Sequence, residues 1–138
     1  MPSHVLVPFD GTPQSEAALS FAVEEWPTAS VTLLYVIDPV AAGLGHGTFP
    51  SDSEAWYESA RETARSTLET ARERVDRAVD DRIEVGNPGR VVVAVADEEP
   101  YDHVVLGSHG RDGVSRVLLG SVAEAVARRS PVPVTVVR

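Results

Sequence analysis

The chain has 138 residues, of which 43% are hydrophobic, a formal net charge of −9 and no cysteine. These values predict one globular domain over residues 1–138 and exclude a disulfide framework or a thiolate zinc site. All 12 basic residues are arginine, and the acidic excess argues against nucleic-acid binding, which needs a basic surface. No signal peptide or long apolar run is visible, so we expect a cytoplasmic protein that does not span a membrane.

The charge is distributed unevenly along the chain. Residues 1–102 contain 7 Arg and 19 acidic residues, whereas residues 103–138 contain 5 Arg and 2 acidic residues. An anionic ligand would therefore be repelled least by the C-terminal part. The acidic balance favours a salt-adapted (halophilic) host, in which dense carboxylates keep proteins in solution. The alternative is a GC-rich genome that encodes a mildly acidic protein.

Apolar runs alternate with helical patterns along the chain. A strand that ends at Asp10 is followed by a helix with Thr12 or Gly11 as its cap and Pro13 at its first position. The segment over residues 41–50 is too irregular to assign. The expected elements are strands over 4–9, 31–37, 82–85, 102–106 and 132–137, with helices over 13–26, 53–79, about 88–97, and from Gly120-Ser121 to before Pro131.

This alternation predicts a three-layer α/β/α fold around a five-stranded parallel sheet. Right-handed crossovers favour the strand order 3-2-1-4-5, with the third strand at an edge. In such sheets the ligand lies beyond the carboxyl ends of the strands, where the strand order reverses. The reversal falls between the first and fourth strands, so Asp10 and Gly107 should face each other across a crevice.

The stretch from Val104 to Ser121 carries the clearest sign of a binding site. Gly107 ends a buried strand, Gly110 follows in the loop, and Gly120-Ser121 opens a helix. Glycine permits close backbone approach, Ser121 can act as an N-cap, and the N-terminus of a helix presents free N–H groups. Such donors favour an anion, above all phosphate. A structural turn followed by a helix cap is the alternative interpretation of the same residues.

The glycine spacing Gly107-x2-Gly110-x9-Gly120-Ser121 resembles the signature of the universal stress protein family, in its ATP-binding branch. The opening strand Val5-Leu6-Val7-Pro8-Phe9-Asp10-Gly11 is similar to that of the family. Three further strands are also similar to their family counterparts: Tyr35-Val36-Ile37-Asp38, Tyr101-Asp102-His103-Val104-Val105-Leu106-Gly107 and Pro131-Val132-Pro133-Val134-Thr135-Val136-Val137. The resemblance covers almost the whole chain and implies an adenine nucleotide hydrolase-like α/β fold.

The resemblance also implies roles for individual residues. Asp10 would hydrogen-bond the ribose, Val36 would contact adenine, and Leu106 with Gly107 would line the base and ribose side. The phosphates would lie against Gly110, Gly120, Ser121 and Val122, largely through backbone N–H groups, with His109 and Arg111 at the same end. The implied ATP-binding set is Pro8, Phe9, Asp10, Val36, Leu106, Gly107, His109, Gly110, Arg111, Gly120, Ser121 and Val122. The implied ligand is ATP, with or without Mg²⁺, and the implied assembly is a homodimer joined through the last strand, about 132–137.

Several of these residues have a simpler interpretation. Asp10 can be a turn residue or helix cap, and His109 can be an exposed loop residue. None of the histidines has partners at the spacing of a metal site, so no metal ligand is assigned. A Walker A loop needs a lysine, which this chain lacks. The Gly43/Gly45/Gly47 run follows the second strand and lacks the third glycine position, so it is no dinucleotide motif.

Three functions remain open from the sequence. The first is an ATP-binding switch or stress-response module, whose nucleotide occupancy favours one of two states. The second is a slow ATP hydrolase, for which the loop offers one carboxylate, Asp112, and no clear general base. The third is a nucleotide-free dimeric scaffold. The intact glycine pattern argues against the scaffold, because a scaffold would not need it.

Overall fold

The computed structural model describes residues 1–41, 53–108 and 119–138. Its sheet has five parallel strands in the order β3-β2-β1-β4-β5, which confirms the predicted topology. The elements are β1 (His4–Pro8), α1 (Pro13–Glu25), β2 (Ser30–Ile37), α2 (Ser53–Glu73), β3 (Asp80–Val85), α3 (Pro88–Ala96), β4 (His103–Gly107), α4 (Ser121–Arg129) and β5 (Val134–Val137).

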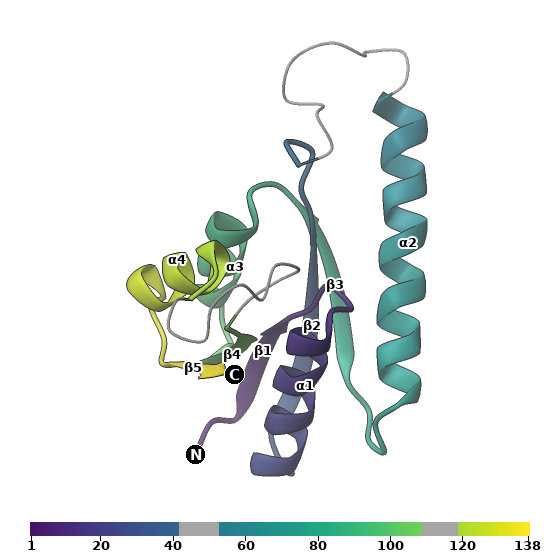
Figure 1. The fold of residues 1–138 in the computed structure, drawn as a ribbon. Coiled ribbons are helices and arrows are strands. Elements are labelled where there is room, and N and C mark those ends of the chain that lie inside the picture. The colour runs from purple at the N-terminus through teal and green to yellow at the C-terminus, as the bar shows by residue number, and fades with distance from the viewer. Residues whose placement is uncertain (42–52, 109–118) are drawn as a thin grey trace.

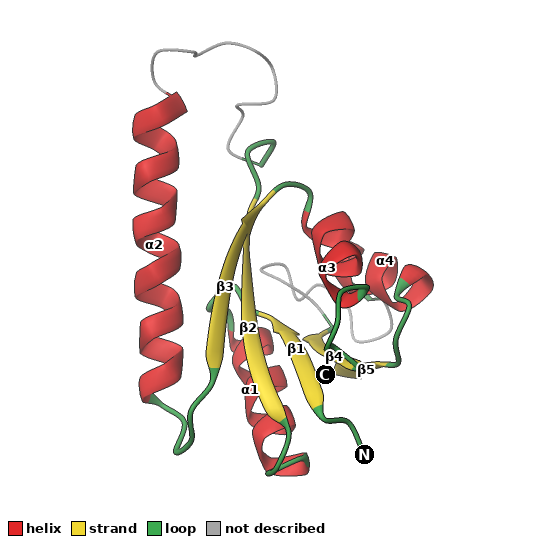
Figure 2. Ribbon diagram, turned by 180° about the vertical axis from the view of Figure 1, so that it is seen from behind, coloured by secondary structure: helices red, strands yellow, loops and turns green. Residues whose placement is uncertain are grey.

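Helices cover both faces of the sheet. The long helix α2 stands on one side and α3 with α4 on the other, as Figure 1 shows and the reverse view in Figure 2 confirms. The strands alternate between two cores: Val5 and Val7 pack with α1 and α2, whereas Leu6 packs with α3 and α4. The inner strands β1 and β4 are buried on both faces, which explains why they read as continuous apolar runs.

The central strand β1 lies between β2 and β4. Val7 is paired with Leu33 on one side, and Leu6 with Val104 on the other. The chain therefore builds outward from β1 to β2 and β3, and then outward from β4 to β5 in the opposite direction. This places the reversal of strand order between β1 and β4, where a ligand is expected.

Two helices begin at a capping residue followed by proline; the cap at Thr12 was predicted from the sequence, whereas the cap at Asn87 was not. The N-cap of α1 is Thr12, whose side chain accepts a hydrogen bond from Ser15 N, and Pro13 follows it. The N-cap of α3 is Asn87, whose side chain accepts from Arg90 N, and Pro88 follows it. Proline suits this place because the first helical N–H needs no intrahelical partner.

The prediction of a helix over 53–79 was wrong at its C-terminal end. The helix α2 ends at Glu73, and Arg74 N donates to Ala71 O at 3.2 Å, the tightened geometry of a last turn. Beyond it, Arg77 Nη1 donates to the Trp26 carbonyl at 3.0 Å, and β3 begins at Asp80 rather than Arg82. Contacts with α1 and pairing with β2 therefore outweigh the helical pattern of residues 74–79.

The last strand is also shorter than predicted. It begins at Val134 instead of residue 132, and Pro131 and Pro133 precede it. Proline has no N–H to donate to a ladder, so pairing through that group starts after Pro133. In the part of the chain that the structure describes, no helix combines the length and the apolar character needed to cross a membrane.

Candidate functional site

On the β1 side of the reversal, the turn after the strand is held by its own side chains. Asp10 Oδ1 accepts hydrogen bonds from Thr12 N at 3.0 Å and from Thr12 Oγ1 at 2.6 Å. Ser15 Oγ donates to Thr12 O at 2.9 Å. Gly11 between them has a φ of +83°, which glycine adopts readily. The predicted turn role of Asp10 is therefore present, and its exposed carboxylate keeps further acceptor positions.

On the β4 side, the strand end is tied directly to the start of α4. Ser108 is buried, its N–H donates to Val137 O at 2.9 Å, and its carbonyl accepts from Gly120 N at 2.6 Å. Gly107 lies against α1: a Cβ at this position would lie 2.8 Å from both the Cβ and the carbonyl oxygen of Gln14. Gly107 is therefore required for packing, whatever it contributes to a ligand.

The start of α4 differs from the starts of α1 and α3. Its N-cap is Gly120, with a φ of −65° and a ψ of 163°, and this glycine has no side chain with which to cap the helix. The expectation that Ser121 acts as the N-cap was wrong, because Ser121 is the first residue of the helix and is exposed. The first N–H groups of a helix have no intrahelical acceptors. This end of α4 can therefore accept an anion on backbone donors.

The apolar residues of the predicted ATP-binding set differ in how far their side chains are exposed to solvent. Phe9 and Leu106 are buried in the two cores, with exposures of 4% and 3%, so their side chains pack within the protein. Val36 and Val122 are half-buried against the core of α3 and α4, and Pro8 is half-buried at the end of β1. The half-buried side chains are the ones that could contact a base.

Three predicted contacts, His109, Gly110 and Arg111, lie outside the described residues, as do Asp112 and most of the 41–50 loop. Their assigned roles stay predictions. The described residues bring together Asp10 after β1, Gly107 and Ser108 at the end of β4, and the start of α4.

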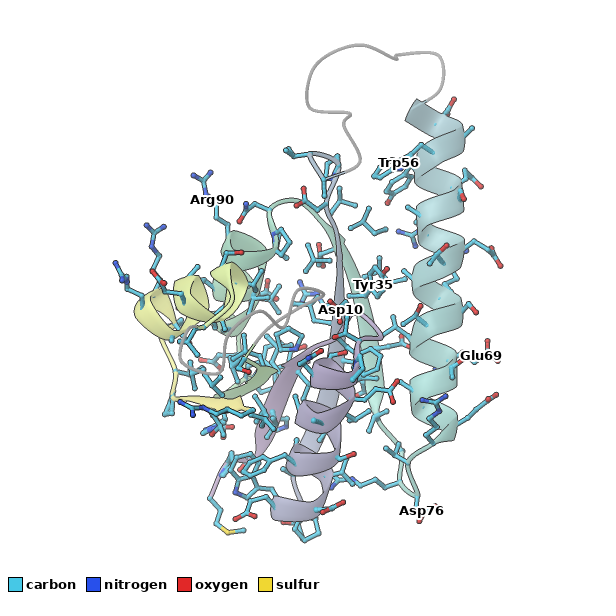
Figure 3. All side chains as sticks on the ribbon, viewed as in Figure 1. Asp10, Tyr35, Trp56, Glu69, Asp76 and Arg90 are labelled. Atoms are coloured by element: carbon cyan, nitrogen blue, oxygen red, sulfur yellow. The ribbon has the colours of Figure 1, made fainter. Side chains whose placement is uncertain are left out.

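A polar groove of about 330 Å³ opens beside Asp10, toward α2. Figure 3 shows Asp10 near the centre of the molecule, between the start of α1 and α2. The hydroxyl-bearing residues Ser66, Thr67 and Thr70 line this groove from α2, and Arg74 lies at its side, paired with Glu16 at 2.9 Å. The groove places hydrogen-bonding groups beside the carboxylate for which the family resemblance implies a ribose contact.

Sequence reasoning missed the packing and hydrogen-bonding roles of residues that support this site. Gln14 leaves no room for a side chain at residue 107, and Ser108 joins β4 to α4 through a backbone hydrogen bond. Thr12 and Ser15 orient Asp10. The spacing Asp10-x-Thr12 is typical of a side-chain turn and could have indicated the last of these. No local pattern indicates the approach of Gln14 to Gly107, because the two residues come from different elements.

The titratable groups with a clear shift near β1 and β4 lie at the opposite, amino ends of these strands. Burial opposes ionisation of Asp102, yet backbone hydrogen bonds from Ser3 and His4 hold its pKa below the usual value. Burial lowers the pKa of His103, whose Nε2 lies 2.7 Å from Thr135 Oγ1 and whose ring meets Trp26 edge-on. These groups connect strand ends and lie away from the proposed ligand.

Comparison with known proteins agrees with this architecture. The family model described as "Universal stress protein family" matches residues 1–138. Universal stress protein MJ0577 of Methanocaldococcus jannaschii is 30% identical over 152 residues, covering 97% of this chain and 93% of the relative. The solved structure of that protein has a TM-score of 0.81 at 32% identity, covering 98% of this chain and 94% of the other.

Two further solved structures are similar across nearly the whole chain. Universal stress protein UspA from Lactobacillus plantarum is 27% identical with a TM-score of 0.81, covering 99% of this chain and 97% of the other. A universal stress protein in complex with cAMP is 25% identical with a TM-score of 0.66, again covering 99% and 97%. With the family model matching every residue, the chain belongs to the universal stress protein family.

Proposed function

We propose that this protein binds an adenine nucleotide, ATP in the first place, and acts as a nucleotide-dependent switch or stress-response module. The observation that carries the proposal is the start of α4, whose N-cap is glycine and which has no side-chain cap, at the point where the strand order reverses. A similar protein of this family was solved in complex with cAMP, itself an adenine nucleotide.

The phosphates would lie at the N-terminus of α4. The partial positive charge of a helix N-terminus and its free N–H groups suit an anion, and Gly120 offers no side chain to block the approach. The chain from residue 103 onward also holds 5 Arg against 2 acidic residues, so this is the region that repels an anion least. Gly110, His109 and Arg111 would add donors from the loop.

The nucleoside would lie toward β1 and β2. The exposed carboxylate of Asp10 is held in place by Thr12 and can accept hydrogen bonds from ribose hydroxyls. Val36 would offer an apolar contact to adenine. In a lysine-free chain the phosphate contacts fall to backbone N–H groups, Ser121 and Arg111. Mg²⁺ would be bound chiefly by the phosphate oxygens.

A switch requires that nucleotide shift the balance between two states, which demands different affinities for them. We place the change at the connection from β4 to α4, because the ligand and the Gly120–Ser108 hydrogen bond share that backbone. We also propose a homodimer joined through the last strand. The strand β5 is an edge strand with half-buried valines, so its outer backbone groups are available for pairing.

The test is direct. The protein is purified in high salt without added nucleotide and denatured, and released nucleotide is identified by chromatography; ATP binding is then measured by calorimetry with and without Mg²⁺. We expect adenine nucleotide to be released or ATP to bind. Finding neither would refute the proposal. ATP that survives hours of incubation supports the switch, whereas steady ADP production would favour the slow hydrolase instead.

A variant tests the site itself. Gly120→Val fills the space at the start of α4, and we expect ATP binding to be lost. Ala127→Val is the matched control, because it places valine at an exposed position near the other end of that helix and should leave affinity unchanged. Unchanged affinity in Gly120→Val would show that the phosphates bind elsewhere.

A further inference from the structure

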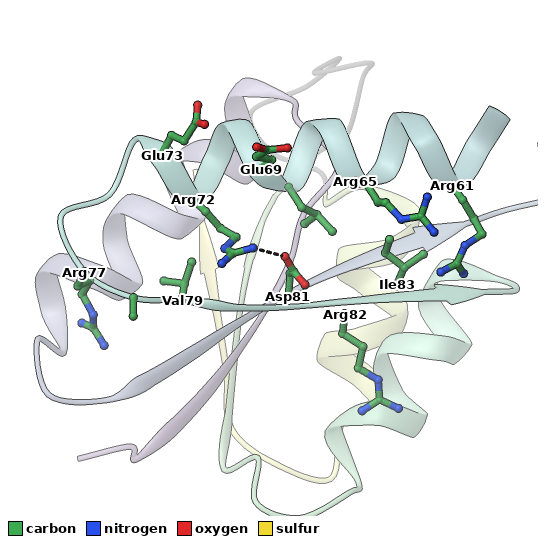
Figure 4. Close-up of a pocket in the computed structure, with 12 residues that line it drawn as sticks. Arg61, Arg65, Glu69, Arg72, Glu73, Arg77, Val79, Asp81, Arg82 and Ile83 are labelled. Carbon is green, nitrogen blue, oxygen red and sulfur yellow. Dashed lines mark hydrogen bonds and ion pairs between the residues drawn. The ribbon is translucent and has the colours of Figure 1, made fainter. Parts of the chain in front are cut away.

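A second groove, of about 790 Å³, lies between α2 and the edge strand β3. Figure 4 shows it from the side, with α2 above and β3 below. Val79, Ile83 and Leu68 give it an apolar lining. Arginine side chains from α2 reach over it, and Glu73 points away from the strand. The proposed nucleotide site does not use this groove.

The groove concentrates positive charge in the most acidic part of the chain. Residues 1–102 contain 7 Arg, and five of them line the groove. Two are held by carboxylates: Arg72 pairs with Asp81 at 2.9 Å, and Arg82 pairs with Glu84 and Glu98. The acidic residues that line it are Glu69, Glu73 and Asp81.

The other three arginines keep charge available for a ligand. Arg61 donates to Tyr57 Oη at 3.0 Å and lies 5.6 Å from the centre of that ring. Arg77 donates to the carbonyls of Trp26 and Val23. Within the described residues neither forms an ion pair, and Arg65 reaches Glu62 only at 3.8 Å with its side chain 58% exposed. A carboxylate brought into the groove would find unneutralised guanidinium groups.

The floor of the groove borders an open backbone edge. Among the described residues, the strand β3 pairs only with β2. Gly86 N donates to Ile37 O, so the even-numbered residues of β3 direct their backbone groups toward β2. Because these groups alternate sides along a strand, the N–H and C=O of Asp81 and Ile83 point outward. An extended chain could pair with them as an added strand.

We propose that this groove binds an extended acidic peptide segment of a partner protein, which pairs with β3 and places its carboxylates against Arg61 and Arg65. From Arg61 to Arg72 the helix rises about 16 Å, the length of roughly five extended residues. A segment with acidic residues at alternate positions would direct them to one side, toward α2, while its backbone pairs with Asp81 and Ile83. This inference is independent of nucleotide binding.

Other occupants fit less well. A nucleic acid would be repelled by the net charge of −9 and would find no aromatic side chain for base stacking among the described residues that line the groove. A second copy of the chain joined at this edge would bring the arginine side chains of two grooves together, and these charges would repel each other. An acidic peptide is the occupant that satisfies both the charge and the backbone edge.

The first test uses a defined probe, a fluorescein-labelled peptide of about six residues in which valine and glutamate alternate. Fluorescence anisotropy at low salt measures its binding to the full chain. We expect the double variant Arg61→Glu/Arg65→Glu to weaken binding by about tenfold or more. The control Arg90→Glu/Arg128→Glu makes the same change in net charge on α3 and α4, across the sheet, and should stay within about twofold of the unmodified protein.

The second test separates strand pairing from charge attraction. A probe of the same sequence, N-methylated at alternate residues, keeps its carboxylates but cannot pair, so it should bind about tenfold more weakly. Hydrogen exchange at the amides of Asp81 and Ile83 should slow when the unmethylated peptide is bound.

The proposal is overturned by any of four results. These are no binding of the acidic peptide, equal binding of its lysine counterpart or of a single-stranded oligonucleotide, unchanged binding by Arg61→Glu/Arg65→Glu, or protection confined to other strands. Light scattering provides a further check: a dimer that Arg61→Glu/Arg65→Glu breaks would assign the groove to a second copy of the chain instead.

Discussion

Two helix starts meet where the strand order reverses, and they are built in opposite ways. At the start of α1, the Thr12 side chain accepts a hydrogen bond from Ser15 N and donates one to Asp10, so this helix end is capped by the protein itself. The start of α4 has glycine as its N-cap and no side-chain cap. A capped helix end satisfies its own donors, whereas an uncapped one leaves them for water or a ligand. The contrast supports our proposal that phosphate would bind at the start of α4, with the α1 turn serving to orient the Asp10 carboxylate.

The largest expected effect concerns Gly107, at the end of β4 beside both helix starts. In Gly107→Ala the new Cβ would lie 2.8 Å from the Cβ and carbonyl oxygen of Gln14, which belong to the rigid helix α1. We expect unfolding free energy to fall by about 3 kcal/mol, since overpacking against backbone cannot relax easily. Chemical denaturation measures it. A loss of nucleotide affinity at full stability would instead make Gly107 a ligand contact alone.

The next prediction converts the start of α4 into one like that of α1. Gly120→Asp supplies a capping carboxylate, so stability should rise by roughly a few tenths of a kcal/mol. Nucleotide affinity should fall about 100-fold, or about 2.7 kcal/mol, because the carboxylate takes the N–H groups and repels phosphate. Calorimetry with ATP measures the affinity and thermal unfolding the stability. If affinity stays unchanged, the contrast between the two starts has no bearing on phosphate binding.

The converse change removes the side-chain cap from the start of α1. Thr12→Ala removes the hydrogen bonds of Thr12 Oγ1 with Asp10 and Ser15. Stability should fall by about 1 kcal/mol, the usual cost of a lost N-cap. Nucleotide affinity should fall only a few-fold, through looser orientation of Asp10. Both values come from the same calorimetric and denaturation experiments; an affinity loss as large as that of Gly120→Asp would place phosphate donors at α1 as well.

The smallest expected effect concerns His103, at the amino end of β4 and away from both helix starts, and it serves as a comparison for the larger effects. Burial lowers the pKa of His103, so the unfolded chain takes up its proton first as pH falls. Stability from this residue should therefore be complete above its ordinary pKa of about 6.5 and decline below it. Thermal unfolding between about pH 7.5 and 5.5 measures the decline, which His103→Gln should reduce. A decline equal in both proteins would assign it to other groups.

Much of the fold follows from local pattern. The runs of apolar residues, the cap at Thr12 with its proline, and the alternation of strand and helix together predicted a parallel sheet in the observed order. These features are local, and right-handed crossovers leave few topologies open. Where prediction failed, as over residues 74–79, contacts with α1 and β2 outweighed a helical pattern that was itself valid.

By itself, the sequence determined the family, the sheet order and the reversal between β1 and β4, because these depend on strand patterns and glycine spacing. Tertiary structure alone decided which glycine packs against Gln14, which helix start has no side-chain cap from its N-cap residue, and how five arginines between residues 61 and 82 come to line one groove beside β3. The physical reason is that close approach and solvent access depend on neighbouring elements, and residues near in space need not be near in the chain.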